Sequence, residues 1–294
     1  MSILSKILLF LTFLTSISFA AEEQKPLEIK LPRANSKEIL NVDVWLGQNV
    51  KGEERGKVII FSHGFRGSNR QSCFLMRALA QAGYNVFAPD HQDVAGFKKP
   101  WKFFTDGQAD FDVPEAWTDD TYRDRAEDIS TLIQTLSQDA RFKSLDWEHL
   151  ALAGHSLGGY TILGLAGAWP SWQKYNIHPV AVLALSPYLR PYLEKYTLGK
   201  VNVPIMYQGG TEDKDITPYL KINNGAFDQT TYPYTYVEFN GANHYSWTLL
   251  KEGFHDVISQ YAIAFFDQTM RGKEFPAELK KQSAKVQEIR TAVF

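Results

Sequence analysis

Residues 150–159 read Leu-Ala-Leu-Ala-Gly-His-Ser-Leu-Gly-Gly, and this stretch decides the fold. A short apolar run leads into the pattern Gly-x-Ser-x-Gly, and a helical pattern follows at once. In such a strand-to-helix turn the serine lies at the apex with its hydroxyl exposed, and the small flanking residues let the chain pass close to its neighbours. Ser156 is therefore a candidate nucleophile. The alternative interpretation is an ordinary glycine-rich turn, so other parts of the chain have to decide.

Apolar strands and amphipathic helices alternate on both sides of this stretch. An edge hairpin is predicted at 27–31 and 39–46, strands at 57–61, 85–89, 150–153, 180–185, 203–208 and 234–239, and helices at 71–81, 121–136, 160–168 and 254–269. This alternation predicts an α/β fold with a mostly parallel twisted sheet and helices on both faces. Only thirteen residues separate Leu189 from Val203, so we expect no large cap domain there.

The composition indicates a globular protein with enough apolar material for one large domain. The chain has 294 residues, 44% of them hydrophobic, and a formal net charge of −2. It lacks a basic block, so we expect no nucleic-acid partner. Cys73 is the single cysteine, which excludes an internal disulfide. We expect one domain over 21–294, with 272–294 forming a charged tail that is marginally helical and packs on the surface or frays.

The first twenty residues have the pattern of a secretory signal. Lys6 precedes an apolar run from Ile7 to Leu14, and Ser18 and Ala20 are small residues before a cleavage site. An N-terminal membrane anchor is the alternative, but the apolar run is short for a span of about 20 residues. Residues 1–20 are therefore predicted to be removed, leaving a secreted or periplasmic protein without a stable membrane span. Its oligomeric state stays open.

An acid and a histidine follow two later strands. A serine hydroxyl needs a nearby base, and the base needs a group that fixes its tautomer and stabilises its charge. Asp213 follows the strand 203–208, with Glu212 and Asp215 as competing candidates, and His244 follows the strand 234–239. Because the carboxyl ends of parallel strands meet at one edge, we expect Ser156, one of these acids and His244 to lie together.

An oxyanion site is the fourth expected element. Attack by Ser156 on a carbonyl creates a negative oxygen, which preorganised N–H groups stabilise. The N–H of Leu157 is one candidate donor. The loop after the strand 57–61 reads Ser-His-Gly-Phe-Arg-Gly-Ser from Ser62 to Ser68, and the N–H of Phe65 is the best second candidate.

These elements together resemble an α/β-hydrolase fold serine hydrolase over residues 27–270. The matching motifs are His63-Gly64-Phe65, the Ser156 elbow, Gly210-Thr211-Glu212-Asp213 and Asn243-His244. Within that fold the chain is similar to the dienelactone hydrolase and platelet-activating-factor acetylhydrolase group, and bacterial polyester-cleaving lipases share the layout. The resemblance favours Asp213 over Asp215 as the acid. Dienelactone hydrolases carry cysteine where this chain has Ser156.

The predicted function is hydrolysis of small-molecule or lipid-like carboxylic esters through an acyl-enzyme. The alternatives are a lipase or polyester hydrolase acting on insoluble substrates and a non-catalytic hydrolase-like binding protein. Tyr245 and Trp247 are expected to line the substrate pocket because they adjoin His244 in sequence. The loop 93–120 is either a functional segment or a surface excursion. His91 lacks further metal ligands at convincing spacing, and we expect neither a metal nor an organic cofactor.

Overall fold

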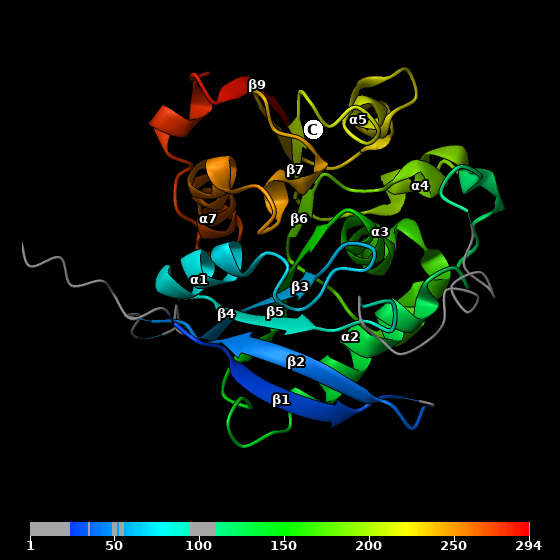
Figure 1. Ribbon diagram of the computed structural model, residues 1–294, viewed down its shortest axis with the longest axis vertical. Helices are drawn as coiled ribbons and strands as arrows, with labels where there is room; N and C mark the ends of the chain where they lie inside the picture. The colour runs from blue at the N-terminus through cyan, green and yellow to red at the C-terminus, as the bar shows by residue number, and fades with distance from the viewer. Residues whose placement is uncertain (1–23, 35, 49–51, 53–55, 95–109, 294) are drawn as a thin grey trace, which may run out of the picture.

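The computed structural model of the chain describes residues 24–34, 36–48, 52, 56–94 and 110–293 (Figure 1). The predicted signal peptide at 1–20 and residues 95–109 of the long loop lie outside these ranges. No helix within them combines the length and the apolar character that crossing a membrane requires.

One sheet organises the described residues. Its strands run in the order β1-β2-β4-β3-β5-β6-β7-β8-β9. The strands are β1 (Leu27–Pro32), β2 (Ile39–Trp45), β3 (Lys57–Ser62), β4 (Asn85–Pro89), β5 (Asp146–His155), β6 (Val182–Leu185), β7 (Ile205–Gly210), β8 (Tyr234–Phe239) and β9 (Val286–Ala292). The six strands from β4 to β8 in this order pair in parallel, whereas β1, β2 and β9 pair antiparallel at the two edges. The predicted, mostly parallel α/β sheet is confirmed.

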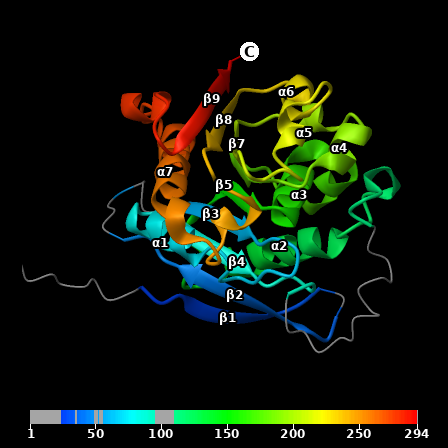
Figure 2. The same ribbon diagram turned by 45° about the horizontal axis from the view of Figure 1, so that its top comes forward.

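Helices cover both faces of the sheet, as Figures 1 and 2 show. The helices are α1 (Cys73–Gln81), α2 (Arg123–Leu136), α3 (Leu157–Leu163), α4 (Arg190–Glu194), α5 (Pro218–Lys221), α6 (Ala226–Gln229) and α7 (His255–Arg271). Shorter 3-10 or π turns are η3 (Pro114–Ala116), η4 (Gly164–Ala168), η5 (Pro170–Tyr175), η6 (Leu198–Lys200), η7 (His244–Trp247), η8 (Glu252–Phe254) and η9 (Ala277–Lys280). α1 and α7 pack side by side on one face, and α2 and α3 pack on the other.

The central strands divide their side chains between two apolar cores. In β3, Val58 and Ile60 face the core under α2 and α3, whereas Ile59 and Phe61 face the core under α1 and α7. Successive residues of a strand point to opposite faces, so a strand covered on both sides must be apolar throughout. This requirement explains the continuous apolar runs that predicted the strands.

The connection between β6 and β7 is short. It contains α4 and η6 and no inserted domain. The prediction that no cap domain interrupts the chain at this point therefore agrees with the structure.

The C-terminal segment is not the marginally helical tail that the sequence predicted. Residues 286–292 form β9, which pairs antiparallel with β8 along the edge of the sheet. Val286 is buried, and the Arg290 guanidinium lies 4.5 Å from the centre of the Phe227 ring. β8 would otherwise expose unpaired backbone groups, and β9 satisfies them while its charged side chains stay at the surface. The high charge of the segment hid this strand from the sequence analysis.

Backbone-to-backbone packing fixes the turn from β5 into α3. An added Cβ at Gly158 would lie 1.9 Å from the carbonyl oxygen of Ser62, and one at Gly154 would lie 2.5 Å from the carbonyl of Gly158. These distances leave no room for a side chain, so glycine is required at both positions.

We expect Gly158→Ala to lower the free energy of unfolding by about 3 kcal/mol, because the methyl group must push two backbone segments apart. Chemical denaturation measures the change. Gly253→Ala is the control, since no atom lies within 4 Å of its added Cβ, and it should change stability by less than about 0.5 kcal/mol. Equal stability of the two variants would contradict this account of the turn.

Candidate active site

Ser156 occupies the apex of the turn between β5 and α3. Its φ of 54° and ψ of −116° are unusual for a residue other than glycine. The hydroxyl faces a cavity at the carboxyl end of the sheet, although the residue is only 9% exposed. The conformation thus turns the side chain out of the packed sheet toward solvent, as the Gly-x-Ser-x-Gly pattern predicts.

His244 lies within hydrogen-bonding distance of this hydroxyl. It begins η7, which a capping box between Asn243 and Ser246 fixes after β8. Its Nε2 lies 2.9 Å from Ser156 Oγ. The structure therefore joins a serine and a histidine that are 88 positions apart in the sequence, in the geometry a general base requires.

Asp213 contacts the other side of the imidazole. Its Oδ1 lies 3.3 Å from His244 Nδ1, and the carboxylate is almost completely buried. Asp215 is exposed on the wall of the cavity, and the Glu212 carboxylate pairs with Lys214 at 3.2 Å. Among the three acids considered from the sequence, the structure places Asp213 against the histidine.

The loop after β3 runs directly against the elbow. An added Cβ at Gly64 would lie 3.4 Å from Ser156 Cβ, and Phe65 lines the same cavity as Ser156. Leu157 follows Ser156 as the first residue of α3. The two backbone segments expected to supply N–H donors are therefore adjacent to the serine.

Hydrogen bonds of Gln71 and His155, both uncharged, join the loop after β3, the elbow at Ser156 and the turn that carries His244. Gln71 Oε1 accepts from the N–H of Gly64 at 3.1 Å, and its Nε2 donates to His155 Nδ1 at 2.9 Å. His155 Nε2 in turn donates to the carbonyl of His244 at 2.9 Å. Burial, followed by the nearby His244, lowers the pKa of His155 and keeps it in the neutral form that these bonds need.

An ion pair holds the backbone of the loop after β3, Ser62 to Ser68. The buried Arg125 guanidinium donates to both oxygens of Asp93 at 2.8 and 3.0 Å and to the carbonyls of His63 and Gly64 at 2.7 and 3.2 Å. Asp93 also accepts the N–H of Arg66 at 3.0 Å. Burial alone raises the pKa of Asp93, but Arg125 outweighs it and holds that pKa well below its usual range.

A second cluster of buried polar side chains surrounds His91, which the sequence analysis considered as a metal ligand. Its Nε2 lies 2.9 Å from Ser62 Oγ, and its Nδ1 lies 3.0 Å from Asp128, whose other oxygen accepts from Arg33 at 2.5 Å. Burial raises the pKa of Asp128 to about 7 against the opposing effect of Arg33. His91 therefore acts as a hydrogen-bonding partner in the protein interior.

The cavity at Ser156 has a volume of about 960 Å³ and mixed walls. Its aromatic and apolar lining comprises Phe65, Phe111, Tyr188, Ile216, Tyr219, Tyr245, Leu249 and Leu250, and its charged lining comprises Arg66, Asp112, Arg190, Lys214 and Asp215. Phe111 packs against Phe65 at 5.2 Å between ring centres. This part of the 93–120 loop thus contributes to the cavity, which suits a small molecule with an apolar body.

The two expected pocket residues after His244 point in different directions. Tyr245 is 55% exposed and lines the cavity. Trp247 is completely buried, and its indole N–H donates to Gln208 Oε1 at 3.0 Å. The expectation for Trp247 therefore does not hold, because the 3-10 turn directs its side chain into the core beneath His155.

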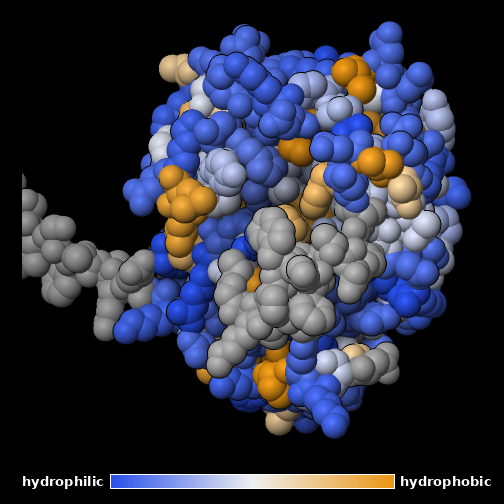
Figure 3. Space-filling model, turned by 45° about the vertical axis from the view of Figure 1, so that its right-hand side comes forward, coloured by the Kyte–Doolittle hydropathy of each residue, from blue (hydrophilic) through white to orange (hydrophobic). Residues whose placement is uncertain are grey.

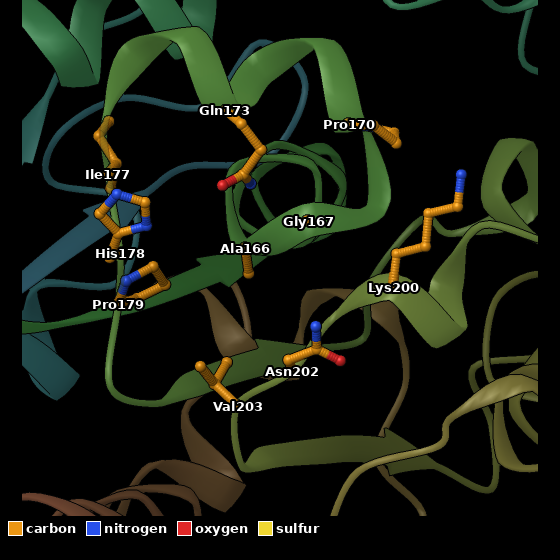
Figure 4. A pocket seen from close by; sticks show the side chains of 10 residues that line it. All are labelled: Ala166, Gly167, Pro170, Gln173, Ile177, His178, Pro179, Lys200, Asn202 and Val203. Carbon is orange, nitrogen blue, oxygen red and sulfur yellow. The ribbon is translucent and has the colours of Figure 1, made fainter.

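A second cavity of about 440 Å³ lies near the amino ends of β6 and β7 (Figure 4). Gln173 and Asn202 point toward its space from opposite sides, and His178 and Lys200 lie at its margin. The described lining contains no nucleophile with an adjacent base.

Sequence reasoning missed Ser186, Gln71 and the pair of Arg125 and Asp93. Ser186 lies far along the chain from His244, Gln71 from His155, and Arg125 from His63. Two of them left a signal: Ser186 directly follows the strand predicted at 180–185, and Arg125 occupies a buried position of a helix next to Ala126. A charged residue at such a position indicates a buried partner.

The fold, together with the row formed by Ser156, His244 and Asp213, matches the class of hydrolases built on an α/β sheet. The model of the alpha/beta hydrolase family matches residues 59–279, which is most of the chain, so the protein belongs to this family. A search of curated proteins finds no match. Among solved structures, a dienelactone hydrolase from Anabaena variabilis is similar with a TM-score of 0.57 and 18% identity, covering 84% of this chain and 99% of that one. This likeness supports the fold.

The buried histidines make stability dependent on pH. Burial, followed by Arg125 for the first two, lowers the pKa of His63, His91 and His155 well below the usual value. Below about pH 6.5 the unfolded chain therefore binds protons that the folded protein excludes, and stability falls as the pH falls. The carboxyls of Asp128 and Asp124 oppose this trend, because burial raises their pKa values to about 7 and about 6.

We expect the three histidines to outweigh the two carboxyls by about one proton, so that the free energy of unfolding falls by about 1 kcal/mol between pH 6 and pH 5. Denaturant titrations at a series of pH values measure this slope. His91→Gln should reduce it, whereas replacing the exposed His178 with Gln should leave it unchanged. A slope of zero or of opposite sign would contradict the neutral state assigned to the buried histidines.

Proposed function

We propose that the protein is an exported serine hydrolase that cleaves carboxylic esters. The observation that carries this proposal is the contact of 2.9 Å between Ser156 Oγ and His244 Nε2, with Asp213 on the far side of the ring. Such an arrangement raises the nucleophilicity of a hydroxyl that is inert by itself near neutral pH. The secretory pattern of residues 1–20 supports export.

In the proposed first step, His244 takes the proton of Ser156 as Oγ attacks the ester carbonyl. The backbone N–H groups of Phe65 and Leu157 stabilise the negative oxygen of the tetrahedral intermediate. The C–O bond to the alcohol then breaks, and His244 Nε2 donates its proton to the departing alcohol. Water repeats the cycle on the acyl-enzyme and releases the acid, so no cofactor takes part.

The open cavity and the short connection between β6 and β7 favour small soluble esters. The aromatic and apolar walls contact the acyl or alcohol part, and no cap encloses it at this connection. An intact line of serine, histidine and acid argues against a non-catalytic binding protein, in which selection would not preserve the geometry of a base beside a nucleophile.

Ser156→Ala should abolish covalent labelling by a fluorophosphonate probe, because the probe needs an activated hydroxyl. Gel fluorescence or intact mass measures the adduct. The control is Ser68→Ala, since Ser68 lines the same cavity without contacting His244, and this variant should still be labelled. Persistent labelling of Ser156→Ala would place the nucleophile elsewhere.

A second candidate function is hydrolysis of insoluble esters. Leu249 and Leu250 are 45% and 79% exposed on the cavity wall beside Tyr245, where an aggregate surface would contact them. Figure 3 shows a face of the molecule on which the visible hydrophobic residues form small separate groups among hydrophilic ones. Two exposed leucines make only a modest contact area, and the soluble-ester function is favoured.

If insoluble esters are the substrates, Leu250→Asp should slow hydrolysis of an emulsified long-chain ester about tenfold, because one buried leucine contact is lost. Hydrolysis of soluble p-nitrophenyl acetate should not change. Leu27→Asp is the control, since Leu27 is an exposed leucine on the remote edge strand β1. Equal rates of wild type and Leu250→Asp on the emulsion would exclude this second candidate.

A further inference from the structure

Ser186 lies between the acid and the base of the proposed site. It follows β6 directly, its N–H donates to the carbonyl of Gln208 at 2.8 Å, and its side chain is completely buried. Its φ of 42° is in the left-handed region, which a residue with a Cβ adopts only at a cost. The backbone conformation thus directs the hydroxyl toward the ends of β7 and β8.

The hydroxyl contacts both partners more closely than they contact each other. Ser186 Oγ lies 2.5 Å from Asp213 Oδ2 and 2.8 Å from His244 Nδ1. The direct approach of Asp213 Oδ1 to the same Nδ1 is 3.3 Å, and this oxygen makes no other hydrogen bond among the described groups. Each contact of the Ser186 hydroxyl is therefore shorter than the direct contact between carboxylate and imidazole.

The number of protons determines the direction of these bonds. An ionised carboxylate only accepts hydrogen bonds, so the single hydroxyl proton of Ser186 is donated to Asp213. The lone pairs of Ser186 Oγ then accept the Nδ1–H of His244. With its proton on Nδ1, the neutral ring presents a free lone pair on Nε2, which is the form that can take the proton of Ser156.

The opposite tautomer fails in this arrangement. If Nδ1 carried no proton, Ser186 would have to donate to either the ring or the carboxylate, and the other contact would bring two acceptors together. At 2.5 and 2.8 Å such a contact is repulsive. The hydroxyl therefore selects the tautomer that the proposed mechanism needs.

We infer that Ser186 is a positioning residue that couples Asp213 to His244 and fixes the tautomer of the base. The inference rests on the proposed function, because it assigns a role within the same site. When His244 becomes charged in the reaction, the Ser186 oxygen, polarised by the carboxylate, stabilises the new charge at Nδ1. Ser186 itself touches neither the substrate nor the reacting atoms.

Thr217 provides a matched control within the same cluster. Its buried hydroxyl donates to Asp213 Oδ2 at 3.2 Å, the same oxygen that Ser186 contacts, and accepts the N–H of Gly210 at 3.0 Å. Thr217→Val removes this hydroxyl and keeps the shape of the side chain. A comparison of Ser186→Ala with Thr217→Val thus separates support of the carboxylate from contact with the imidazole.

The test combines kinetics with proton NMR of the resting protein. In Ser186→Ala, kcat/KM for p-nitrophenyl acetate should fall about tenfold to a hundredfold, as loss of a hydrogen bond to a charged group implies, with KM within about twofold of wild type. The acid limb of the kcat/KM profile should move to lower pH. The downfield Nδ1–H resonance of His244, assigned with His244→Gln, should move upfield in Ser186→Ala and stay in place in Thr217→Val.

Two results would overturn the inference: an unmoved Nδ1–H resonance in Ser186→Ala, or equal kinetic losses in Ser186→Ala and Thr217→Val with an unchanged pH profile. Ser186→Gly, which suits the positive φ, replaces the alanine variant if that variant does not fold. The resonance needs neither substrate nor a reactive Ser156. A protein that fails to hydrolyse esters but shows the resonance shift would refute the proposed function and retain the coupling.

Discussion

The close approach of α3 to the end of β3 is the constraint on which the site depends. The backbone at Gly158 and the carbonyl of Ser62 lie so near that no side chain fits between them. This contact brings the elbow that carries Ser156 against the loop that begins at His63. Ser156 and the N–H groups expected to act with it are therefore placed by backbone packing. Such packing is more rigid than contacts between long side chains, and catalysis by preorganised dipoles needs rigidity.

Buried charges hold the loop after β3 at a cost in desolvation. The pair of Arg125 and Asp93 replaces water with protein hydrogen bonds, and such buried pairs add little to stability compared with apolar residues of equal size. The planar guanidinium, however, reaches two carbonyl oxygens and a carboxylate at once, which neither an apolar side chain nor lysine can do. The position of this ion pair is explained better by the geometry of the loop than by the free energy of unfolding.

The sequence allowed prediction of the fold and of the strands that carry the site, because strands buried on both faces require continuous apolar runs. It also placed Ser156 and His244 after the correct strands. It did not show which direction Trp247 takes, because side-chain direction after a strand depends on a turn whose shape local residues do not determine. Ser186 and Arg125 were missed for a related reason, since their partners are distant in sequence. β9 was hidden by its charge, because an edge strand needs only one partly buried face.

The hydrogen bonds of the neutral His155 and the ion pair of Arg125 and Asp93 respond differently to acid. Gln71 donates to Nδ1 of His155, so this nitrogen has to keep a lone pair, and its protonation would break the link between Gln71 and the elbow while the Nε2–H donation to the His244 carbonyl remains. The ion pair under the loop after β3 has no such requirement, because a guanidinium is charged at all relevant pH values and holds the pKa of Asp93 well below its usual range. Acid therefore disrupts the neutral link that runs from His155 through Gln71 to the N–H of Gly64 before it disrupts the ion pair. The loop after β3 is thus held by two kinds of chemistry, and the one that weakens at low pH is the hydrogen bonding through Gln71.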